Sequence, residues 1–319
     1  MEPAIKITGL TKRFGGLTAV DGLNLEVPEG SIFGFLGANG AGKTTTLRMI
    51  AGLARPTSGS IEVAGIASTE GTAYRRRIGY LCQEPAFYGW MTGREVLRYA
   101  GGFFADRAPG TGSAAEIERL LCLVGLERGA DRRCGASSGG MRQRLGIAAA
   151  LVGKRRVLIL DEPATGLDPI GRRDVLDLME SLRRTTTIFY STHILDDVQR
   201  VSDHVAVVDR GRLLVSSETG KLLESQGRNR LQVELMGANA ETAARLAQIP
   251  GVISVGRPEV TPAGRSFEVE FAAGQGPNVQ AALTRFAAES GLAVVSARTA
   301  SVDLEDVFLR LVDTKENAA

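Results

Sequence analysis

The stretch GANGAGKTT, residues 37–45, follows the apolar run SIFGFL and continues into TTLRMIAGL, where apolar residues recur at helical spacing. A short apolar run of this kind predicts a buried strand, and the recurrence predicts a helix. Because glycine adopts backbone conformations that other residues avoid, the clustered glycines indicate a tight turn between these two elements. The chain must therefore contain a strand, a glycine-rich loop and a helix in direct succession.

The rest of the first two-thirds of the chain alternates short β-branched runs with amphipathic stretches. This alternation is typical of a largely parallel sheet covered by helices, so we expect an α/β fold. Strands are expected at 4–10, 23–27, 31–37, 60–65, 157–161, 185–193 and 204–209, and helices at 45–53 and 114–127.

The last third of the chain has an order of its own. A polar stretch at 226–230 has the composition of a linker, which predicts two domains, 1–225 and 226–319. The order of elements after it, β-α-β-β-α-β, predicts a small α+β domain of the ferredoxin-like type. The expected strands are 231–237, 251–260, 266–273 and 292–297, and the expected helices are 241–249, 278–291 and a closing one at 304–312.

The composition excludes several classes of protein. A net charge of +2 calls for no polyanionic partner, so no nucleic acid is expected. The 3 cysteines lack metal-ligand spacing, and an odd number argues against a disulfide framework, which favours the cytoplasm. Charged residues within 1–30 argue against a signal peptide, and the apolar runs are shorter than the roughly 20 residues that cross a bilayer.

The glycine-rich loop matches the pattern G-x-x-x-x-G-K-[ST] through Gly37, Gly42, Lys43 and Thr44. Backbone N–H groups of such a loop and the positive end of the following helix hold phosphate. Lys43 is then expected at the β- and γ-phosphates of a nucleotide and the Thr44 hydroxyl on Mg²⁺. An accidental glycine-rich turn is the alternative, and the flanking strand and helix argue against it. The other expected nucleotide-binding residues of the loop are Asn39, Gly40 and Thr45.

Two further segments carry chemistry. The run VLILDEPATGLDP, 157–169, brings Asp161 to the end of a strand, where Mg²⁺ is expected, and Glu162 next to it can hold an attacking water. In 136–151 a helix opens on Ser138 and two glycines, Gly139 and Gly140, which is a second anion site. Two anion sites in one chain favour a homodimer in which each of two nucleotides lies between the copies.

With these motifs in order, the segment 1–225 resembles an ATP-binding-cassette (ABC) ATPase, a P-loop domain with a helical subdomain. Further motifs complete the resemblance: Phe14 where the family stacks an aromatic ring on adenine, Gln83 in the Q-loop, SSGGM as the signature, VLILDEP as Walker B, Asp168 in the D-loop and His193 as the switch histidine. Two positions depart from the usual signature, because Ser137 replaces a Leu or aromatic residue and Met141 replaces Gln.

The resemblance implies ATP and Mg²⁺ as ligands and a role for each motif residue. Glu162 is implied as the general base, and His193 as a contact of the γ-phosphate. Gln83 is implied to sense Mg²⁺ and the attacking water. Ser138 and Gly140 are implied to touch the γ-phosphate bound to the opposite copy.

Aromatic residues cluster after Gln83, at Phe87, Tyr88 and Trp90, and such a cluster predicts either a docking surface or the core of a helical subdomain. The family analogue of the docking surface receives a cytoplasmic helix of a separately encoded membrane permease. The C-terminal domain resembles the extension of daunorubicin-resistance-type exporter ATPases, which also end in a helix like LEDVFLRLV. We expect it to assist dimerisation or to regulate turnover, with ligand sensing as the alternative.

Three functions compete. The favoured one is the ATPase subunit of an exporter, peripheral on the inner face of the cell membrane through its permease. The second is a soluble ABC mechanoenzyme on ribosomes or DNA, which usually carries two cassettes or a long coiled coil, and this chain has one cassette and no sustained heptads. The third is a nucleotide-binding regulator without hydrolysis, which Glu162 and His193 argue against.

Overall fold

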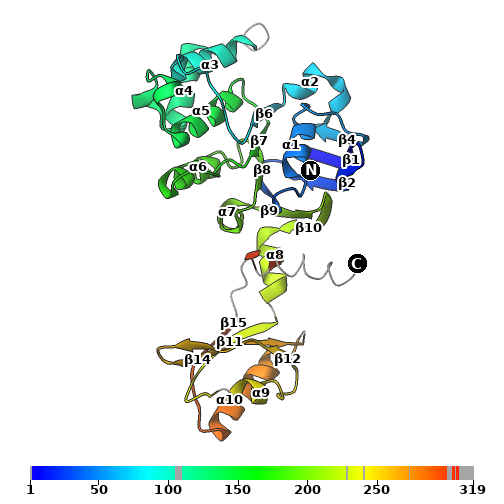
Figure 1. Ribbon diagram of the computed structural model, residues 1–319, viewed down its shortest axis with the longest axis vertical. Coiled ribbons are helices and arrows are strands. Elements are labelled where there is room, and N and C mark those ends of the chain that lie inside the picture. The colour runs from blue at the N-terminus through cyan, green and yellow to red at the C-terminus, as the bar shows by residue number, and fades with distance from the viewer. Residues whose placement is uncertain are drawn as a thin grey trace. The chain divides into compact units, whose positions relative to one another are not determined.

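The computed structural model describes residues 2–104, 110–227, 229–239, 241–272, 274–299, 304–305 and 307–308. Contacts divide the chain into two compact units, Met1–Thr219 and Gly220–Ala319 (Figure 1).

The centre of the first unit is a six-stranded sheet in the order β10-β9-β3-β8-β7-β6. Its strands are β3 (Ile32–Leu36), β6 (Ile78–Leu81), β7 (Val157–Asp161), β8 (Thr187–Thr192), β9 (His204–Asp209) and β10 (Arg212–Glu218). All neighbours pair in parallel except β10, which is antiparallel to β9. Every residue of β3, β7 and β8 is buried, as expected of strands covered on both faces. The predicted parallel sheet is thus confirmed.

A second, antiparallel sheet packs against the first and completes the core. Its order is β2-β1-β4-β5, and its strands are β1 (Ile5–Phe14), β2 (Leu17–Val27), β4 (Ser58–Val63) and β5 (Ile66–Ala67). Phe33, Phe35 and Phe189 of the parallel sheet belong to one buried cluster with residues of β1 and β2, and the rings of Phe33 and Phe35 lie 5.7 and 5.3 Å from that of Phe189. The helices α1 (Lys43–Ile50) and α2 (Thr72–Arg75) lie beside this sheet in Figure 1.

A helical subdomain lies between β6 and β7 in the sequence. It comprises α3 (Gly93–Gly102), α4 (Ala114–Leu123) and α5 (Gly139–Leu151), and the helices α6 (Pro169–Ser181) and α7 (Leu195–Val201) follow later (Figure 1). Side-chain oxygens of Thr92, Ser113 and Ser138 accept hydrogen bonds from the first turns of α3, α4 and α5. These caps satisfy backbone donors that have no partner inside a helix, and so they define where each helix begins.

The second unit contains an antiparallel sheet, with helices before it and between its strands. Its order is β12-β14-β11-β15, and β13 pairs with β14. The elements are α8 (Thr219–Gly227), β11 (Arg230–Met236), α9 (Thr242–Leu246), β12 (Val252–Val255), β13 (Glu259–Thr261), β14 (Gly264–Phe271), α10 (Gly276–Glu289) and β15 (Ala293–Thr299). Leucine, valine and phenylalanine side chains of α9, of α10 and of the sheet form its core.

Two expectations for this unit were wrong. The single strand at 251–260 is two strands, because β14 is long enough to pair with β12 along one part and with β13 along another. The linker at 226–230 is shorter than expected, since α8 continues to Gly227 and β11 begins at Arg230. The closing helix expected at 304–312 lies largely outside the described residues. Within the part that is described, Leu304 and Val307 are buried.

Candidate functional site

The carboxyl ends of the parallel strands meet at one edge of the central sheet, and the sequence motifs follow these ends. The glycine-rich loop follows β3, Glu162 follows β7, His193 follows β8 and Gln83 follows β6. In open α/β sheets this edge is where ligands bind. The sheet order therefore brings together residues that are more than a hundred positions apart.

The loop after β3 needs its glycines. A Cβ on Gly37 would lie 2.5 Å from the carbonyl oxygen of Val208, which no side chain can accommodate. Gly42 has a φ of +94°, and a Cβ there would lie 2.4 Å from the carbonyl oxygen of Ala19. Gly40 has a φ of +85° and faces open space. The loop can thus present its backbone N–H groups as a cradle for phosphate.

Lys43, the first residue of α1, is buried with its ammonium group inside this cradle. Its Nζ donates hydrogen bonds to the carbonyl oxygens of Gly37, at 2.7 Å, and Ala38, at 3.2 Å. The same Nζ lies 3.3 Å from Oε1 of Glu162. The positive charge is therefore held between the loop and the end of β7.

The Asp161 carboxylate lies beside two hydroxyl groups, and oxygen atoms of this kind are suitable ligands for a hard cation. Its Oδ1 accepts hydrogen bonds from the hydroxyls of Thr44, at 3.0 Å, and Ser191, at 2.7 Å. No cluster of three His, Cys, Asp or Glu side chains occurs among the described residues. Mg²⁺ is bound through one or two carboxylates plus substrate phosphates and water, so the Thr44 hydroxyl and the Asp161 carboxylate fit this ion.

Glu162 is buried and held from three sides. Its Oε2 accepts a hydrogen bond from Thr165, at 2.6 Å, and lies 2.8 Å from Nδ1 of His193, while its N–H donates to the Ser191 hydroxyl at 3.0 Å. Its φ of +50° is unusual for a residue other than glycine, and such strain is typical of functional sites.

Burial alone acts to raise the pKa of the Glu162 carboxyl group. The hydrogen bond from Thr165 and the charges of Lys43 and His193 outweigh it, so that the pKa lies below its ordinary value. Glu162 is therefore a buried, ionised carboxylate at neutral pH. This is the state that a general base requires.

Thr165 and Ser191 are the site residues that sequence reasoning missed. Ser191 links Asp161 to Glu162, and Thr165 fixes one Glu162 oxygen. A serine in the fully buried strand β8 was a usable signal, because a buried hydroxyl needs a partner. Thr165 lies in a loop and carried no signal of this kind.

Other predicted residues lie apart from this cluster. Ser138 caps α5 by accepting from the N–H of Met141, at 3.2 Å, and Asp168 caps α6 by accepting from that of Gly171, at 2.6 Å. Neither side chain hydrogen-bonds to the cluster around Glu162 in the part of the chain that the structure describes. Ser137 occupies the signature position that departs from the usual Leu or aromatic residue. Its carbonyl oxygen accepts a hydrogen bond from the Arg142 guanidinium at 2.5 Å.

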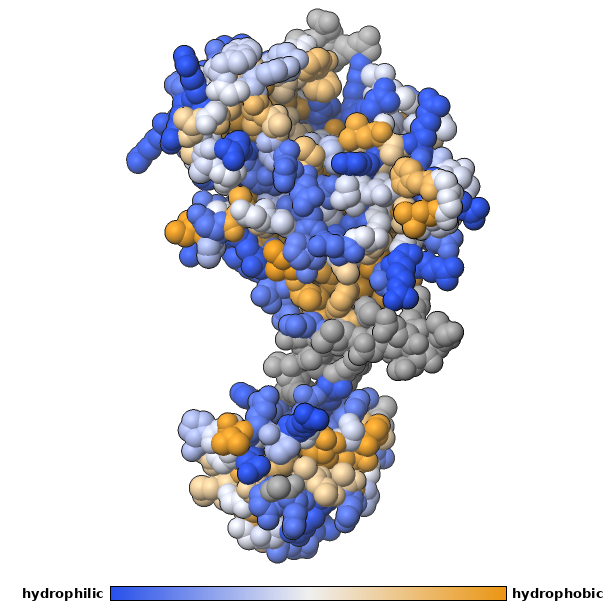
Figure 2. Space-filling model, viewed as in Figure 1, coloured by the Kyte–Doolittle hydropathy of each residue, from blue (hydrophilic) through white to orange (hydrophobic). Residues whose placement is uncertain are grey.

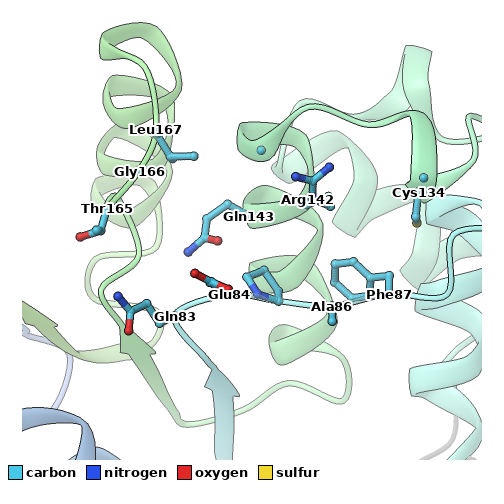
Figure 3. Close-up of a pocket in the computed structure, with 13 residues that line it drawn as sticks. Gln83, Glu84, Ala86, Phe87, Cys134, Arg142, Gln143, Thr165, Gly166 and Leu167 are labelled. Atoms are coloured by element: carbon cyan, nitrogen blue, oxygen red, sulfur yellow. The ribbon is translucent and has the colours of Figure 1, made fainter.

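Gln83 and Phe14 are both exposed. Gln83 belongs to the segment 82–87, which we call the Q-loop, and it lines a cavity of about 490 Å³ beside α5 (Figure 3). Phe14 is 54% exposed at the end of β1, with Nζ of Lys12 4.9 Å from its ring centre.

The aromatic cluster after the Q-loop is largely on the surface. Tyr88 and Trp90 are 62% and 66% exposed, and their rings stack at 5.7 Å, whereas Phe87 is half-buried. The alternative of a subdomain core is therefore wrong for Tyr88 and Trp90. On the face shown in Figure 2, hydrophilic side chains predominate and apolar ones form small groups. None of the helices in the described ranges is long and apolar enough to cross a bilayer.

The chain matches the family model described as ABC transporter over residues 20–165. It is 38% identical, over 98% of both chains, to the bacitracin transport ATP-binding protein BcrA of Bacillus licheniformis. It is also 38% identical, over 97% of its length and 92% of the relative, to the daunorubicin/doxorubicin resistance ATP-binding protein DrrA of Streptomyces peucetius. The chain belongs to the family of ABC transporter ATP-binding proteins.

Solved structures agree with this assignment. An ATP-binding subunit of an ABC transporter is similar at a TM-score of 0.61 and 29% identity, over 70% of this chain and 93% of that one. The subunit CbiO1 of Clostridium perfringens is similar at a TM-score of 0.64 and 25% identity, over 78% and 97%. The first unit is thus an ABC ATPase domain with a P-loop, and the protein is an ATP-binding ATPase.

Proposed function

We propose that this chain is the ATP-hydrolysing subunit of an exporter and drives a separately encoded, polytopic membrane permease from the cytoplasmic side. One observation carries the proposal: the Glu162 carboxylate lies 3.3 Å from the Lys43 ammonium and 2.8 Å from the His193 imidazole. This is a base placed beside a phosphate cradle. Similarity along nearly the full length to BcrA and DrrA, named for bacitracin transport and daunorubicin/doxorubicin resistance, favours a drug or antibiotic as substrate.

The residues at the sheet edge divide the work of hydrolysis. Mg²⁺ supplies charge neutralisation for the phosphates, and the Thr44 hydroxyl and Asp161 carboxylate would hold it. Lys43 binds the β- and γ-phosphates. Glu162 orients the attacking water and takes its proton, and His193 contacts the γ-phosphate.

The remaining motif residues complete the site in a head-to-tail homodimer. Ser138 and Gly140 stand at the N-terminus of α5, where backbone N–H groups and the helix dipole favour an anion. We assign them to the γ-phosphate bound by the opposite copy. Gln83 then reports the occupancy of the site to the permease through the Q-loop, and Phe14 stacks on adenine.

The second unit is proposed as a ferredoxin-like domain that assists dimerisation or regulates turnover. Its strand order β12-β14-β11-β15, with every pair antiparallel, supports this topology. The helices α9 and α10 supply the two helical steps of the β-α-β-β-α-β order.

Affinity purification of the tagged chain from detergent-solubilised membranes of its host tests the exporter proposal. We expect a polytopic membrane protein in stoichiometric amount, identified by mass spectrometry, because the described chain has no span of its own. Ribosomal proteins or DNA-repair factors in place of a membrane protein would favour the mechanoenzyme instead.

The pH dependence of hydrolysis tests the role of Thr165. Its hydrogen bond lowers the pKa of Glu162, so Thr165→Val is expected to raise that pKa. Because the base works only when ionised, the acidic limb of the kcat/KM profile should move to higher pH. Thr165→Ser keeps the hydroxyl and is the matched control. An acidic limb that Thr165→Val leaves in place would contradict the assignment.

A further inference from the structure

Gln143 is a buried polar residue that the site described so far does not use. It lies on α5 and is 4% exposed. Counted by helical spacing, it shares the core-facing stripe with Ile147 and Leu151, four and eight positions on. Its Nε2 is buried and has no hydrogen-bond partner. A buried donor without a partner destabilises the state in which it occurs, so another arrangement in which the donor is satisfied is favoured.

The Q-loop lies directly on the same helix. A Cβ on Gly146 would lie 2.5 Å from the end of the Leu81 side chain and 3.3 Å from Pro85 of the Q-loop, so the helix passes close to this loop. Gln143 and Glu84 both line the cavity of about 490 Å³ between α5, the Q-loop and the loop 165–167. Figure 3 shows the Gln143 amide and the Glu84 carboxylate pointing toward one another across this cavity.

The two groups are chemically complementary. The carboxylate of Glu84 has no hydrogen-bond or ion-pair partner among the residues that the structure describes, and the amide N–H₂ of Gln143 is a donor without an acceptor. A carboxylate is an acceptor only, and hydrogen bonds to charged groups are the stronger ones. Glu84 also follows Gln83 directly, so that a bond to Glu84 determines where Gln83 lies.

We propose that Gln143 is a positioning residue for the Q-loop: its amide donates a hydrogen bond to the Glu84 carboxylate when nucleotide binding draws the Q-loop toward α5. The bond holds Gln83 at the nucleotide and ties the helical subdomain to the sheet edge. The inference rests on the proposed hydrolysis of ATP. Among the described residues, neither Gln143 nor Glu84 has a hydrogen bond or ion pair with the Glu162 cluster, so their loss is expected to change kcat and to leave the KM for ATP unchanged.

An exchange of the two groups tests the pair in the full chain. Gln143→Glu sets two carboxylates against each other and is expected to lower kcat about tenfold. Adding Glu84→Gln puts the amide and the carboxylate in each other's places and should restore most of the rate. If water accepts the hydrogen bond of the Gln143 amide both with and without nucleotide, the two substitutions act independently. The double variant is then no faster than Gln143→Glu, which overturns the proposal.

A second readout does not depend on hydrolysis. Trp90 is the only tryptophan of the chain and follows the Q-loop, so its emission reports the position of that loop. ATP with Mg²⁺ should change the emission of the native chain, Gln143→Glu should abolish the change, and the double variant should recover it. If the native chain binds ATP and the Trp90 emission does not change, the proposal is overturned.

Two controls keep the outcomes apart. Thermal unfolding shows whether Gln143→Glu folds, and if it does not, Glu84→Ala at an exposed position removes the acceptor and should give the same loss of kcat and of the Trp90 response. A normal rate and response in Glu84→Ala would count against the pair. The native chain and Glu162→Gln in the same preparation test hydrolysis itself, so a failure of the proposed function is seen separately.

Discussion

Glu162→Gln is expected to slow ATP hydrolysis by roughly 10²–10⁴-fold while ATP binding persists. The carboxylate is ionised because Thr165, Lys43 and His193 lower its pKa against the effect of burial. An amide of the same shape cannot take a proton from water. Steady-state ATPase assays measure the rate, and light scattering in the presence of ATP should show the variant accumulating as a dimer, since the proposed homodimer places each nucleotide between two copies.

The control for this variant is Glu180→Gln, at an exposed position near the end of α6, which should keep the native rate. A native rate in Glu162→Gln would remove Glu162 as the base. A variant that binds ATP and stays monomeric would contradict the composite site and leave the assignment of the base intact. The two outcomes therefore test separate parts of the mechanism.

Lys43→Ala is expected to weaken ATP binding by about 10- to 100-fold, because hydrogen bonds to a charged group contribute about 1.5–3 kcal/mol each. The ammonium group is buried in the loop, held by the carbonyl oxygens of Gly37 and Ala38. No other lysine or arginine hydrogen-bonds to these two carbonyls in the ranges that the structure describes. Isothermal titration calorimetry measures the loss of affinity directly.

The same substitution has a second effect at Glu162. The charge of Lys43 lowers the pKa of that carboxyl group, so Lys43→Ala should raise it. In the activity that this variant keeps at saturating ATP, the acidic limb of the pH–rate profile should therefore lie at higher pH than in the native chain. Lys6→Ala, at an exposed position of β1, is the matched control. Unchanged affinity in Lys43→Ala would contradict its role at the phosphates.

Much of the first unit was predictable from local patterns. The strands β3 and β7 are nearly continuous apolar runs, and β8 and β9 have apolar centres; such runs mark strands that are covered on both faces. The second unit was harder to predict. Its strands are short and half-exposed, and the split of 251–260 into β12 and β13 depends on their pairing with β14, a partner distant in sequence.

The candidate site shows the same division. Lys43, Asp161 and Glu162 stand in motifs whose chemistry is local, so the sequence alone predicted them. Thr165 and Ser191 lie beside the motif residues, but no chemical role was predicted for either, because that role comes from their hydrogen bonds to Glu162 and Asp161 in the folded chain.

The sequence by itself determined the α/β class, the phosphate loop and the ABC family, and it predicted the base, because each depends on motifs whose residues are close together along the chain. The tertiary structure alone decided the lowered pKa of Glu162, the exposure of Trp90 and the unpartnered amide of Gln143 beside the Q-loop. The physical reason is that burial, charge and hydrogen bonding depend on neighbours in space. Those neighbours are set by the order of strands in the sheet and by the packing of α5 against it.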